Sequence, residues 1–276
     1  MSLKINTNVA SLQGQSALRK ASQDMESSQA KLSSGLRITK AADDAAGLAI
    51  SEKMRAEIRS GHQANRNAND GISMVQTAEG GLNETSTLLT RMKELAVQAA
   101  NDTLTDADRR LVEGEYQMMK MELDRIASST EFNGKKLLNG TGESLDFQVG
   151  IGGKAMNRVS YDPSSVRSDS RSLGISEGSV SSKTGAQNVL GSIDRALDKI
   201  SGHRSMLGSI QNRLQTSSNN MGIYTDNMSA SNSRIRDVDY AMETANLARS
   251  RVITDTSSAV LAQANTDPRA ALKLVE

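Results

Sequence analysis

Apolar residues recur every seven positions through the last third of the chain, and this repeat is the strongest constraint on its fold. The repeat falls on Ala186, Ile193, Ile200, Leu207, Leu214, Met221 and Met228. A second apolar column beside it shifts from four residues past the first column to three. Heptads sustained over this length predict a coiled-coil helix, and the shift predicts a seam that drifts around it. The chain is therefore expected to act through surfaces that pack on other helices rather than through a pocket.

The composition fits slender helices better than a globular enzyme. Only 37% of the 276 residues are hydrophobic, and the aromatic side chains are four Tyr and two Phe with no Trp. A core built from Leu, Ile, Val, Met and Ala suits a helical bundle. The 33 Lys and Arg residues balance 32 Asp and Glu residues and form no basic stripe, which argues against a nucleic-acid partner.

Few residues could carry catalytic or metal chemistry. The absence of Cys excludes disulfides, thiolate zinc sites and thiol nucleophiles. The two histidines, His62 and His203, each lack a second histidine nearby, which disfavours a metal or acid–base role. The glycines between Gly150 and Gly153 fit a hairpin turn better than a phosphate loop, since no Lys-Ser or Lys-Thr pair follows them. We therefore expect no catalytic residue, no metal site and no cofactor, and we do not expect an enzyme.

The sequence predicts no insertion into a membrane, because no stretch approaches the ~18 consecutive apolar residues of a spanning helix. The first residues, Met1 to Asn6, also lack a charged region followed by an apolar region. If the protein leaves the cell, we expect an export route that uses no cleaved signal peptide.

Two helical stripes are predicted at the start of the chain. The first runs from Ile5 to Leu32 with alternating steps of three and four, and residues 33–35 interrupt it. Asp43 and Asp44 then introduce a second stripe, in keeping with the preference for carboxylates at a helix N-terminus.

A heptad-like seam follows over residues 75–99 and contains Gly80 and Gly81. Each glycine costs a helix about 1 kcal/mol relative to Ala, so the pair indicates either a close approach of another helix or a local bend. Thr105 and Asp108 then predict a capping box, with Asp in place of the usual Glu, at the start of a further helix.

Turn and strand signals occupy the middle of the chain. Asn-Gly pairs at 133–134 and 139–140 are predicted to end the third helix. Apolar residues alternate with polar ones over 145–151 and again over 157–161, which predicts a β-hairpin. The Ser- and Gly-rich stretch 164–185 has little periodicity and is predicted to form a surface loop.

The long heptad-bearing helix is predicted to break at the small polar residues 229–233, and a last helix to run from Ile235 to Pro268. The expected fold is mainly α: a long antiparallel coiled coil or helical bundle formed by the N- and C-terminal halves, with a small β-hairpin in the middle. The expected segments are an N-terminal helix at 1–44, the N-terminal bundle helices at 45–140, the hairpin and loop at 141–185, the long C-terminal bundle helix at 186–230, and a C-terminal helix at 231–276.

The two ends carry too little apolar surface to fold alone. Each offers roughly six to eight apolar side chains, worth about 10–25 kcal/mol on full burial. Ordering ~40 residues costs on the order of 40–80 kcal/mol of backbone entropy, and hydrogen bonds that compete with water offset only part of it. We therefore expect ends that are loosely structured in the monomer and become helical when many copies share their stripes. A closed monomeric bundle is the alternative.

Self-assembly is expected to depend on apolar residues in both terminal segments. Placing a charge in the shared stripe, as in Ile253→Asp, should abolish polymerisation while the middle helices stay folded. The residues expected to carry the assembly are Ile5, Val9, Leu12, Leu18, Met25, Leu32, Ile235, Val238, Met242, Val252, Ile253, Val260 and Leu261.

Ordered motifs occur near both ends of the chain. They lie at Leu32–Ile38, Asp43–Gly47, Arg66–Ile72, Glu94–Asn101, Glu131–Gly134, Arg236–Ala241 and Ser258–Asn265. Together they strongly resemble bacterial flagellin over residues 1–140 and 185–276. The Ser-rich loop stands where many flagellins insert outer domains, so the chain resembles a minimal flagellin.

The resemblance implies a homopolymer: an extracellular filament for swimming motility, with the N- and C-terminal segments paired as filament-core helices. It also implies export of an unfolded chain through the flagellar type III apparatus and an export chaperone on the C-terminal segment. Hook-associated junction and filament-cap proteins would be further partners. A flagellin-like hook–filament junction protein, which would share the terminal motifs but assemble only to a limited extent, is the alternative.

A second surface follows from the resemblance alone. The stretch from Arg91 to Leu95 is similar to the patch that Toll-like receptor 5 of animal hosts recognises in flagellins, with Arg91, Leu95 and Glu115 at the matching positions. Two positions depart from the family pattern: Thr90 stands where Gln is usual and Lys93 where Arg is usual. In a purely structural interpretation, Leu95 is partly buried and Arg91 and Glu115 form solvated ion pairs worth at most ~1 kcal/mol.

Overall fold

The computed structural model describes residues 7–272, and its contacts divide the chain into two units. The terminal unit combines Met1–Ala56 with Asn227–Glu276, so that it joins the two ends of the chain. The central unit comprises Glu57–Asp226. The helices α2 (Ala45–Ala99) and α5 (Lys183–Arg236) contribute residues to both units.

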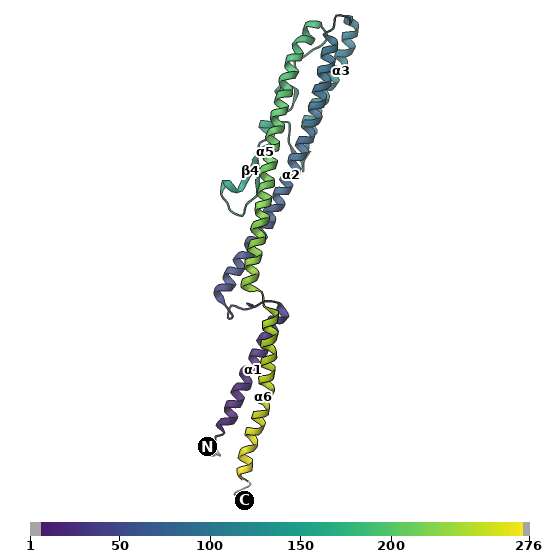
Figure 1. Cartoon of the computed structure of the whole chain (residues 1–276). Coiled ribbons are helices and arrows are strands. Elements are labelled where there is room, and N and C mark those ends of the chain that lie inside the picture. The colour runs from purple at the N-terminus through teal and green to yellow at the C-terminus, as the bar shows by residue number, and fades with distance from the viewer. Residues whose placement is uncertain (1–6, 273–276) are drawn as a thin grey trace. The chain divides into compact units, whose positions relative to one another are not determined.

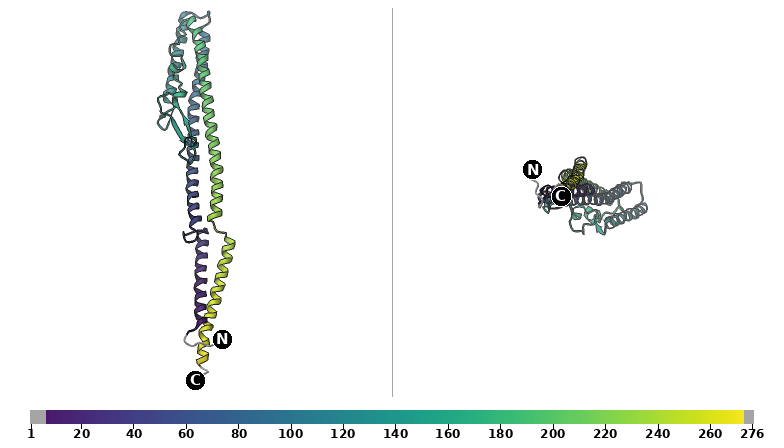
Figure 2. Two further views of the ribbon diagram at one scale, coloured as in Figure 1. Left: turned by 90° about the vertical axis from the view of Figure 1, so that its left-hand side faces the viewer. Right: turned by 90° about the horizontal axis from the view of Figure 1, so that it is seen from below.

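In the terminal unit, α1 (Val9–Ser34) and α6 (Tyr240–Leu272) lie side by side along their length (Figures 1 and 2). Asn8 caps α1, because its side chain accepts the Ser11 N–H at 3.0 Å. Gly35 ends the helix in the left-handed conformation with φ 70°. The expected antiparallel pairing of the N- and C-terminal segments is confirmed.

Two short connections link the helices of the terminal unit. Leu36 pairs with Asp237 in an isolated antiparallel bridge, and the Val238 N–H donates to Gly35 O at 3.0 Å. Asp239 caps α6, since its Oδ1 accepts the N–H groups of the second and third helical residues at 2.9 and 3.1 Å. Backbone pairing of this kind holds the two connections together.

The two acids before α2 have different roles. Asp44 Oδ1 accepts the Gly47 N–H at 2.8 Å and starts the helix as expected. Asp43 instead closes the preceding turn: its Oδ2 accepts the N–H groups of Lys40 and Thr39, each at 3.0 Å, and the Thr39 hydroxyl at 2.9 Å. The hydrogen bonds from Lys40 and then Thr39 lower the pKa of the Asp43 carboxyl. The expectation that both acids serve the helix start is thus wrong for Asp43.

The central unit packs α2 and α5 against each other and against α3 (Asp106–Ser129) around one apolar core (Figure 1). The heptad column predicted for α5 is confirmed over most of its length: Ala186, Ile193, Ile200, Leu207 and Leu214 are all buried. The capping box of α3 is also confirmed, because Thr105 Oγ1 accepts the Asp108 N–H at 3.3 Å and Asp108 Oδ2 accepts the Thr105 N–H at 3.1 Å.

The paired glycines of α2 differ in their surroundings. A Cβ on Gly81 would lie 2.7 Å from Leu138 Cδ1 and 2.8 Å from Thr130 Oγ1, whereas a Cβ on Gly80 would meet nothing within 4 Å. Gly81 therefore permits a close approach of the chain that follows α3, rather than the approach of another helix that the sequence suggested.

Two small antiparallel pairings follow α3. The predicted hairpin is confirmed as β3 (Leu145–Gln148) and β4 (Arg158–Tyr161), in a register that pairs Leu145 with Tyr161 and Gln148 with Arg158. The 3₁₀ turn η1 (Ala155–Asn157) lies in its connection. A second pairing, β1 (Glu131–Phe132) with β2 (Lys135–Lys136), forms across Asn133 and Gly134, which have φ of 49° and 76°. The Asn-Gly turn thus makes a hairpin as well as ending a helix.

The stretch 164–185 is more ordered than the sequence predicts. It contains most of η2 (Pro163–Val166) and all of α4 (Ser170–Leu173), and Asp124 Oδ1 accepts the Ser170 N–H at 2.7 Å. The surface-loop prediction is wrong because isolated apolar residues without a period still reach the core. The side chains buried there are Val166, Leu173, Ile175 and Val180.

Two predicted helix ends are also wrong. The small polar residues 229–233 do not break α5, which continues to Arg236, since Ser and Asn cost a helix only a fraction of a kcal/mol each. The backbone of α6 continues through Pro268 to Leu272. A proline removes one hydrogen bond from a helix, and this loss does not end α6.

Candidate assembly surfaces

The contact between α1 and α6 is built from small side chains. On α1 the buried positions are Ser11, Gly14, Ala21 and Ser28, and on α6 they include Ser250 and Ala264. A Cβ on Gly14 would lie 3.5 Å from Leu261 Cδ1, so the helices approach closely at this point. Small side chains remove little apolar area from water, and the hydrophobic contribution of this contact is correspondingly modest.

Polar contacts complete the pairing of these two helices. Asn8 Nδ2 donates to Ala264 O at 2.7 Å, and Ser11 Oγ donates to Asn265 Oδ1 at 2.9 Å. At the other end, the Tyr240 hydroxyl donates to Leu32 O at 3.0 Å. Each neutral hydrogen bond contributes about 1 kcal/mol net, so these contacts fix the register of the pair more than they stabilise it.

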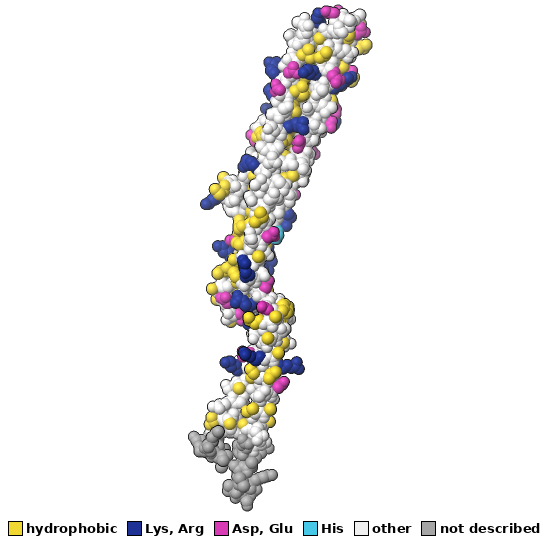
Figure 3. Space-filling model, in the orientation of Figure 1, with side chains coloured by type: hydrophobic (Ala, Val, Ile, Leu, Met, Phe, Trp, Pro, Cys, Tyr) yellow, Lys and Arg dark blue, Asp and Glu magenta, His cyan; other side chains and the backbone are white. Residues whose placement is uncertain are grey.

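Several large apolar side chains of the same helices are exposed to solvent instead. Leu12 is 56% exposed and Val252 is 64% exposed. Apolar side chains gather over these helices in the lower part of Figure 3. Among the predicted assembly residues, the exposed ones are Val9, Leu12, Met242, Val252, Ile253 and Val260. Ile50 and Tyr240, which the sequence analysis did not single out, are exposed as well.

The other predicted assembly residues have a different setting. Ile5 lies outside the described residues. The half-buried ones are Leu18, Met25, Leu32, Ile235, Val238 and Leu261. The predicted assembly residues within the described part of the chain are therefore divided into half-buried side chains and side chains that are exposed to solvent.

Ion pairs hold the connection between the helices of the terminal unit. Glu52 binds Arg55 at 3.0 Å and also pairs with Arg236, whose guanidinium lowers the pKa of the Glu52 carboxyl. Arg37 Nη2 donates to Ile235 O at 2.5 Å. The Glu52–Arg236 pair fastens the end of α5 to the start of α2, and the Arg37 hydrogen bond fastens it to the connection before α2.

The surface matched to receptor recognition lies on α2 and α3. Arg91 binds Glu94 at 2.9 Å and Glu115 at 3.1 Å, and these two carboxylates raise the pKa of the Arg91 guanidinium. All three side chains are exposed. Leu95 is only 1% exposed and belongs to the core, so its side chain is not available for direct contact with a partner.

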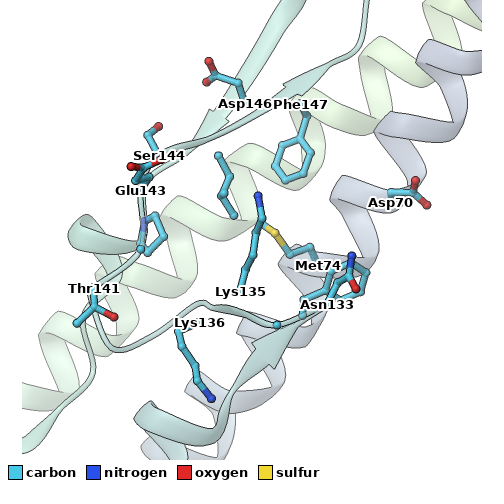
Figure 4. A pocket seen from close by; sticks show the side chains of 15 residues that line it. Asp70, Met74, Asn133, Lys135, Lys136, Thr141, Glu143, Ser144, Asp146 and Phe147 are labelled. Atoms are coloured by element: carbon cyan, nitrogen blue, oxygen red, sulfur yellow. The ribbon is translucent and has the colours of Figure 1, made fainter.

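The sequence did not predict several exposed apolar side chains and an open pocket on the central unit. The exposed side chains include Val97, Leu111, Met118 and Met121. The spacing of seven between Leu111 and Met118 is the signal that could have revealed them. The pocket has a volume of about 900 Å³ and lies beside β1, β2 and β3 (Figure 4). No local sequence pattern indicates the pocket, because its walls come from segments that are far apart in the sequence.

Metal and membrane features are absent from the described part of the chain. Among residues 7–272, no three His, Cys, Asp or Glu side chains gather closely enough to hold a metal ion. Burial lowers the pKa of His203, while its hydrogen bond to the Arg167 backbone acts in the opposite direction. Within the same residues, none of the helices has the length and apolarity needed to cross a membrane.

Comparison with known proteins gives matches over nearly the whole chain. A model of the bacterial flagellin N-terminal helical region matches residues 5–143, and a model of the C-terminal helical region matches residues 190–275. The flagellin of Halalkalibacterium halodurans is 43% identical over 89% of each chain. The flagellar filament core protein flaB2 of Brachyspira hyodysenteriae is 39% identical over 99% of each chain. The flagellin of Bacillus subtilis is 37% identical over 99% of this chain and 100% of its own.

Solved structures agree with these sequence matches. The crystal structure of Bacillus cereus flagellin has a TM-score of 0.51 and 31% identity, and the match covers 56% of this chain and 88% of that one. A putative flagellar hook-associated protein from Vibrio parahaemolyticus has a TM-score of 0.58 at 15% identity, over 71% of this chain and 100% of its own, and shares the fold.

Proposed function

Because this chain belongs to the bacterial flagellin family and is a structural subunit of the flagellar filament, we propose that its exposed terminal side chains hold neighbouring subunits together. The assembly set comprises Ile5, Val9, Leu12, Leu18, Met25, Leu32, Ile235, Val238, Met242, Val252, Ile253, Val260 and Leu261. In this proposal the half-buried members of α1 and α6 fix that pair, Ile235 and Val238 support the connection from α5 to α6, and the exposed members contact other copies.

The proposal is supported by where small and large side chains lie in the terminal unit. Small residues form the contact between α1 and α6, while large apolar residues such as Leu12 and Val252 face solvent. An isolated soluble protein gains nothing from this arrangement, because exposed apolar area is stabilising only when a partner covers it. Contacts between unlike surfaces of identical copies build an open helical polymer when the rotation between copies does not close a ring.

The alternative of a hook–filament junction protein is not favoured. Relatives that match over nearly the whole chain are named flagellins and filament core proteins. The hook-associated neighbour, at 15% identity, shows the fold alone.

Ile253→Asp tests the assembly surface, with Ala248→Asp as its matched control. Ile253 is 44% exposed, so covering it in the filament is worth about 1 kcal/mol. Burying a carboxylate in its place costs several kcal/mol. Since 1.4 kcal/mol corresponds to a factor of ten, the concentration needed to elongate sheared filament seeds should rise at least ~100-fold. Elongation at an unchanged concentration would contradict the proposal.

The control isolates the position of the added charge. Ala248 lies seven residues before Asp255 and thus on the same face of α6, a face that already carries a carboxylate. Ala248→Asp should elongate seeds within a few-fold of the unsubstituted concentration, and circular dichroism should show unchanged helicity for both variants.

We further propose, from the family, that the chain is exported through the flagellar type III apparatus without a cleaved signal. A chaperone would hold its C-terminal segment, and hook-associated junction and cap proteins would bound the extracellular filament. Binding of the purified chaperone by residues 231–276 alone tests the first contact, and full binding by a chain that lacks those residues would exclude it.

Receptor recognition is a separate proposal. Arg91 and Glu115 are exposed and paired at 3.1 Å, which supports them as the charged part of a surface for Toll-like receptor 5. The buried Leu95 would act by supporting α2 from inside. Arg91→Ala should weaken activation of receptor-bearing reporter cells by the monomer without changing its helicity, and unchanged activation would remove Arg91 from the surface.

A further inference from the structure

The pocket of the central unit has an apolar floor. Both phenylalanines of the chain line it, Phe132 from β1 and Phe147 from β3, together with Met74 from α2. Figure 4 shows the ring of Phe147 and the side chains of Met74 and Lys135 directed into the same space. Met74 is only 3% exposed and belongs to the core, so the two half-buried phenylalanines provide the accessible apolar surface of the floor. Aromatic side chains are typical of the centre of a protein–protein contact.

The rim of this pocket carries excess negative charge. Asp70, Glu143 and Asp146 line it, against Lys135 and Lys136. Lys136 pairs with Glu131 outside the lining, so its positive charge is already compensated. The net negative charge of the rim, together with the apolar floor, favours a partner that combines an apolar side chain with positive charge.

The tip of the β3–β4 hairpin has these properties. Met156 in η1 is 83% exposed, and Ile151 is also exposed. Lys154 and Arg158 flank Met156, and no acid occurs from Val149 to Arg158. In Figure 3, apolar and basic side chains lie together on the projection that this hairpin forms in Figure 1.

The hairpin tip is also held in a defined shape. Gln148 Nε2 donates to Gly150 O at 2.7 Å and to Gly152 O at 2.8 Å, while the Val149 N–H donates to Asn157 O at 2.9 Å. A tip that is already ordered loses little conformational entropy when it binds.

We propose that the hairpin tip of one copy, residues 150–158, docks into the pocket of a neighbouring copy in the filament. Met156 enters the apolar floor, and Lys154 faces the acidic rim near Glu143. The tip cannot reach the pocket of its own chain. It lies beside residues 60–67 of α2, whereas the pocket is lined by Asp70, Met74 and the opposite end of β3.

This inference rests on the proposed filament function, and it adds a second contact that is independent of the terminal helices. Tip and pocket are unlike surfaces of one chain. In a helical filament, where a rotation and a translation relate successive copies, such a contact is repeated from copy to copy.

Cross-linking in filaments tests the contact directly, because the chain contains no Cys and each introduced thiol is unique. Met156→Cys and Glu143→Cys chains are mixed in equal amounts, elongated on unsubstituted seeds and treated with a short bis-maleimide. The control mixture replaces the tip variant with Met118→Cys, an exposed methionine on α3. The contact predicts covalent dimers at several times the yield of the control.

Normal filaments with no more dimer than the control would overturn the inference. If the proposed filament function itself were wrong, unsubstituted chains would not elongate the seeds at all, so the two failures can be told apart. Charge reversal gives a second readout: Lys154→Glu and Glu143→Lys should each raise the elongation concentration up to about fivefold at low salt, within the range of exposed ion pairs. The double variant should restore the unsubstituted elongation concentration. If the two single increases simply multiplied in the double variant, the contact would also be contradicted.

Discussion

The chain has two fully buried tyrosines, and the hydroxyl of only one of them makes a hydrogen bond within the described residues. Replacing each by Phe therefore removes the same group with and without the loss of a hydrogen bond. The Tyr161 hydroxyl donates to Leu137 O at 2.6 Å, whereas the Tyr116 hydroxyl finds no partner among the residues that the structure describes. Tyr161→Phe leaves a buried carbonyl without its donor, which costs about 1–3 kcal/mol. Tyr116→Phe removes a polar group that is already unsatisfied, so its effect should be neutral or stabilising.

The free energy of unfolding is expected to differ by about 2 kcal/mol between the two variants, the middle of that range. For a unit of this size, each kcal/mol shifts Tm by roughly 2–4 °C, so Tyr161→Phe should melt about 4–8 °C below Tyr116→Phe. Far-UV circular dichroism of the monomer, followed through heat and urea unfolding, measures both values without relying on tyrosine emission. Equal losses in the two variants would refute this assignment of hydrogen bonds.

The same residues predict how stability changes in alkali. Burial raises the pKa of Tyr116 to about 12 and also raises that of Tyr161. An unfolded tyrosine ionises near pH ~10 and so loses its proton before the folded one does. Stability is therefore complete below pH ~10 and decreases as the pH rises toward the folded pKa. Tyr116→Phe should reduce this alkaline loss, and an unchanged pH profile would contradict the role of Tyr116.

Gly81→Ala should destabilise the central unit by about 1–3 kcal/mol, because the new methyl would lie 2.7 Å from Leu138 Cδ1. Gly80→Ala, with open space around it, should instead stabilise α2 by up to about 1 kcal/mol, and thermal unfolding of the two variants decides whether the opposite signs hold. Asp43→Asn should loosen the turn before α2, seen as faster amide exchange of Thr39 and Lys40. Since the pKa of Asp43 is lowered in the folded state, its contribution is present above the unfolded pKa and is lost as the pH falls through the folded pKa, so exchange in the Asn variant should depend less on acid.

Features that depend on local chemistry were predictable from the sequence. The heptad column of α5 is buried from Ala186 to Leu214, because a period of seven places successive residues on one face whatever the partner is. The capping box at Thr105 and the alternation in β3 and β4 likewise involve groups only a few positions apart. In each case the pattern and the interaction occupy the same short segment.

Features that join distant segments were not predictable in this way. Periodicity identified apolar positions on α1, but it could not tell that the small residues Ser11 and Gly14 face α6 while Leu12 faces solvent. The order within 164–185 depends on Asp124, which binds Ser170 from another helix. The pocket beside β3 combines walls from α2 and two hairpins, so neither its shape nor its charge exists in any single segment.

The separation of the two ends in sequence has a consequence for assembly. The hydrogen bond from Asn8 to Ala264 O spans 256 positions, and closing a flexible loop of that length costs on the order of 5 kcal/mol. Folding of the central unit reduces this cost, because the Tyr224 hydroxyl donates to Glu57 Oε2 at 2.6 Å and sets the two ends of that unit side by side. The weak, small-residue contact of α1 with α6 can then form between neighbouring segments. The apolar surface that we propose to recruit other copies is therefore complete only in a chain whose middle has folded and whose last helix is present.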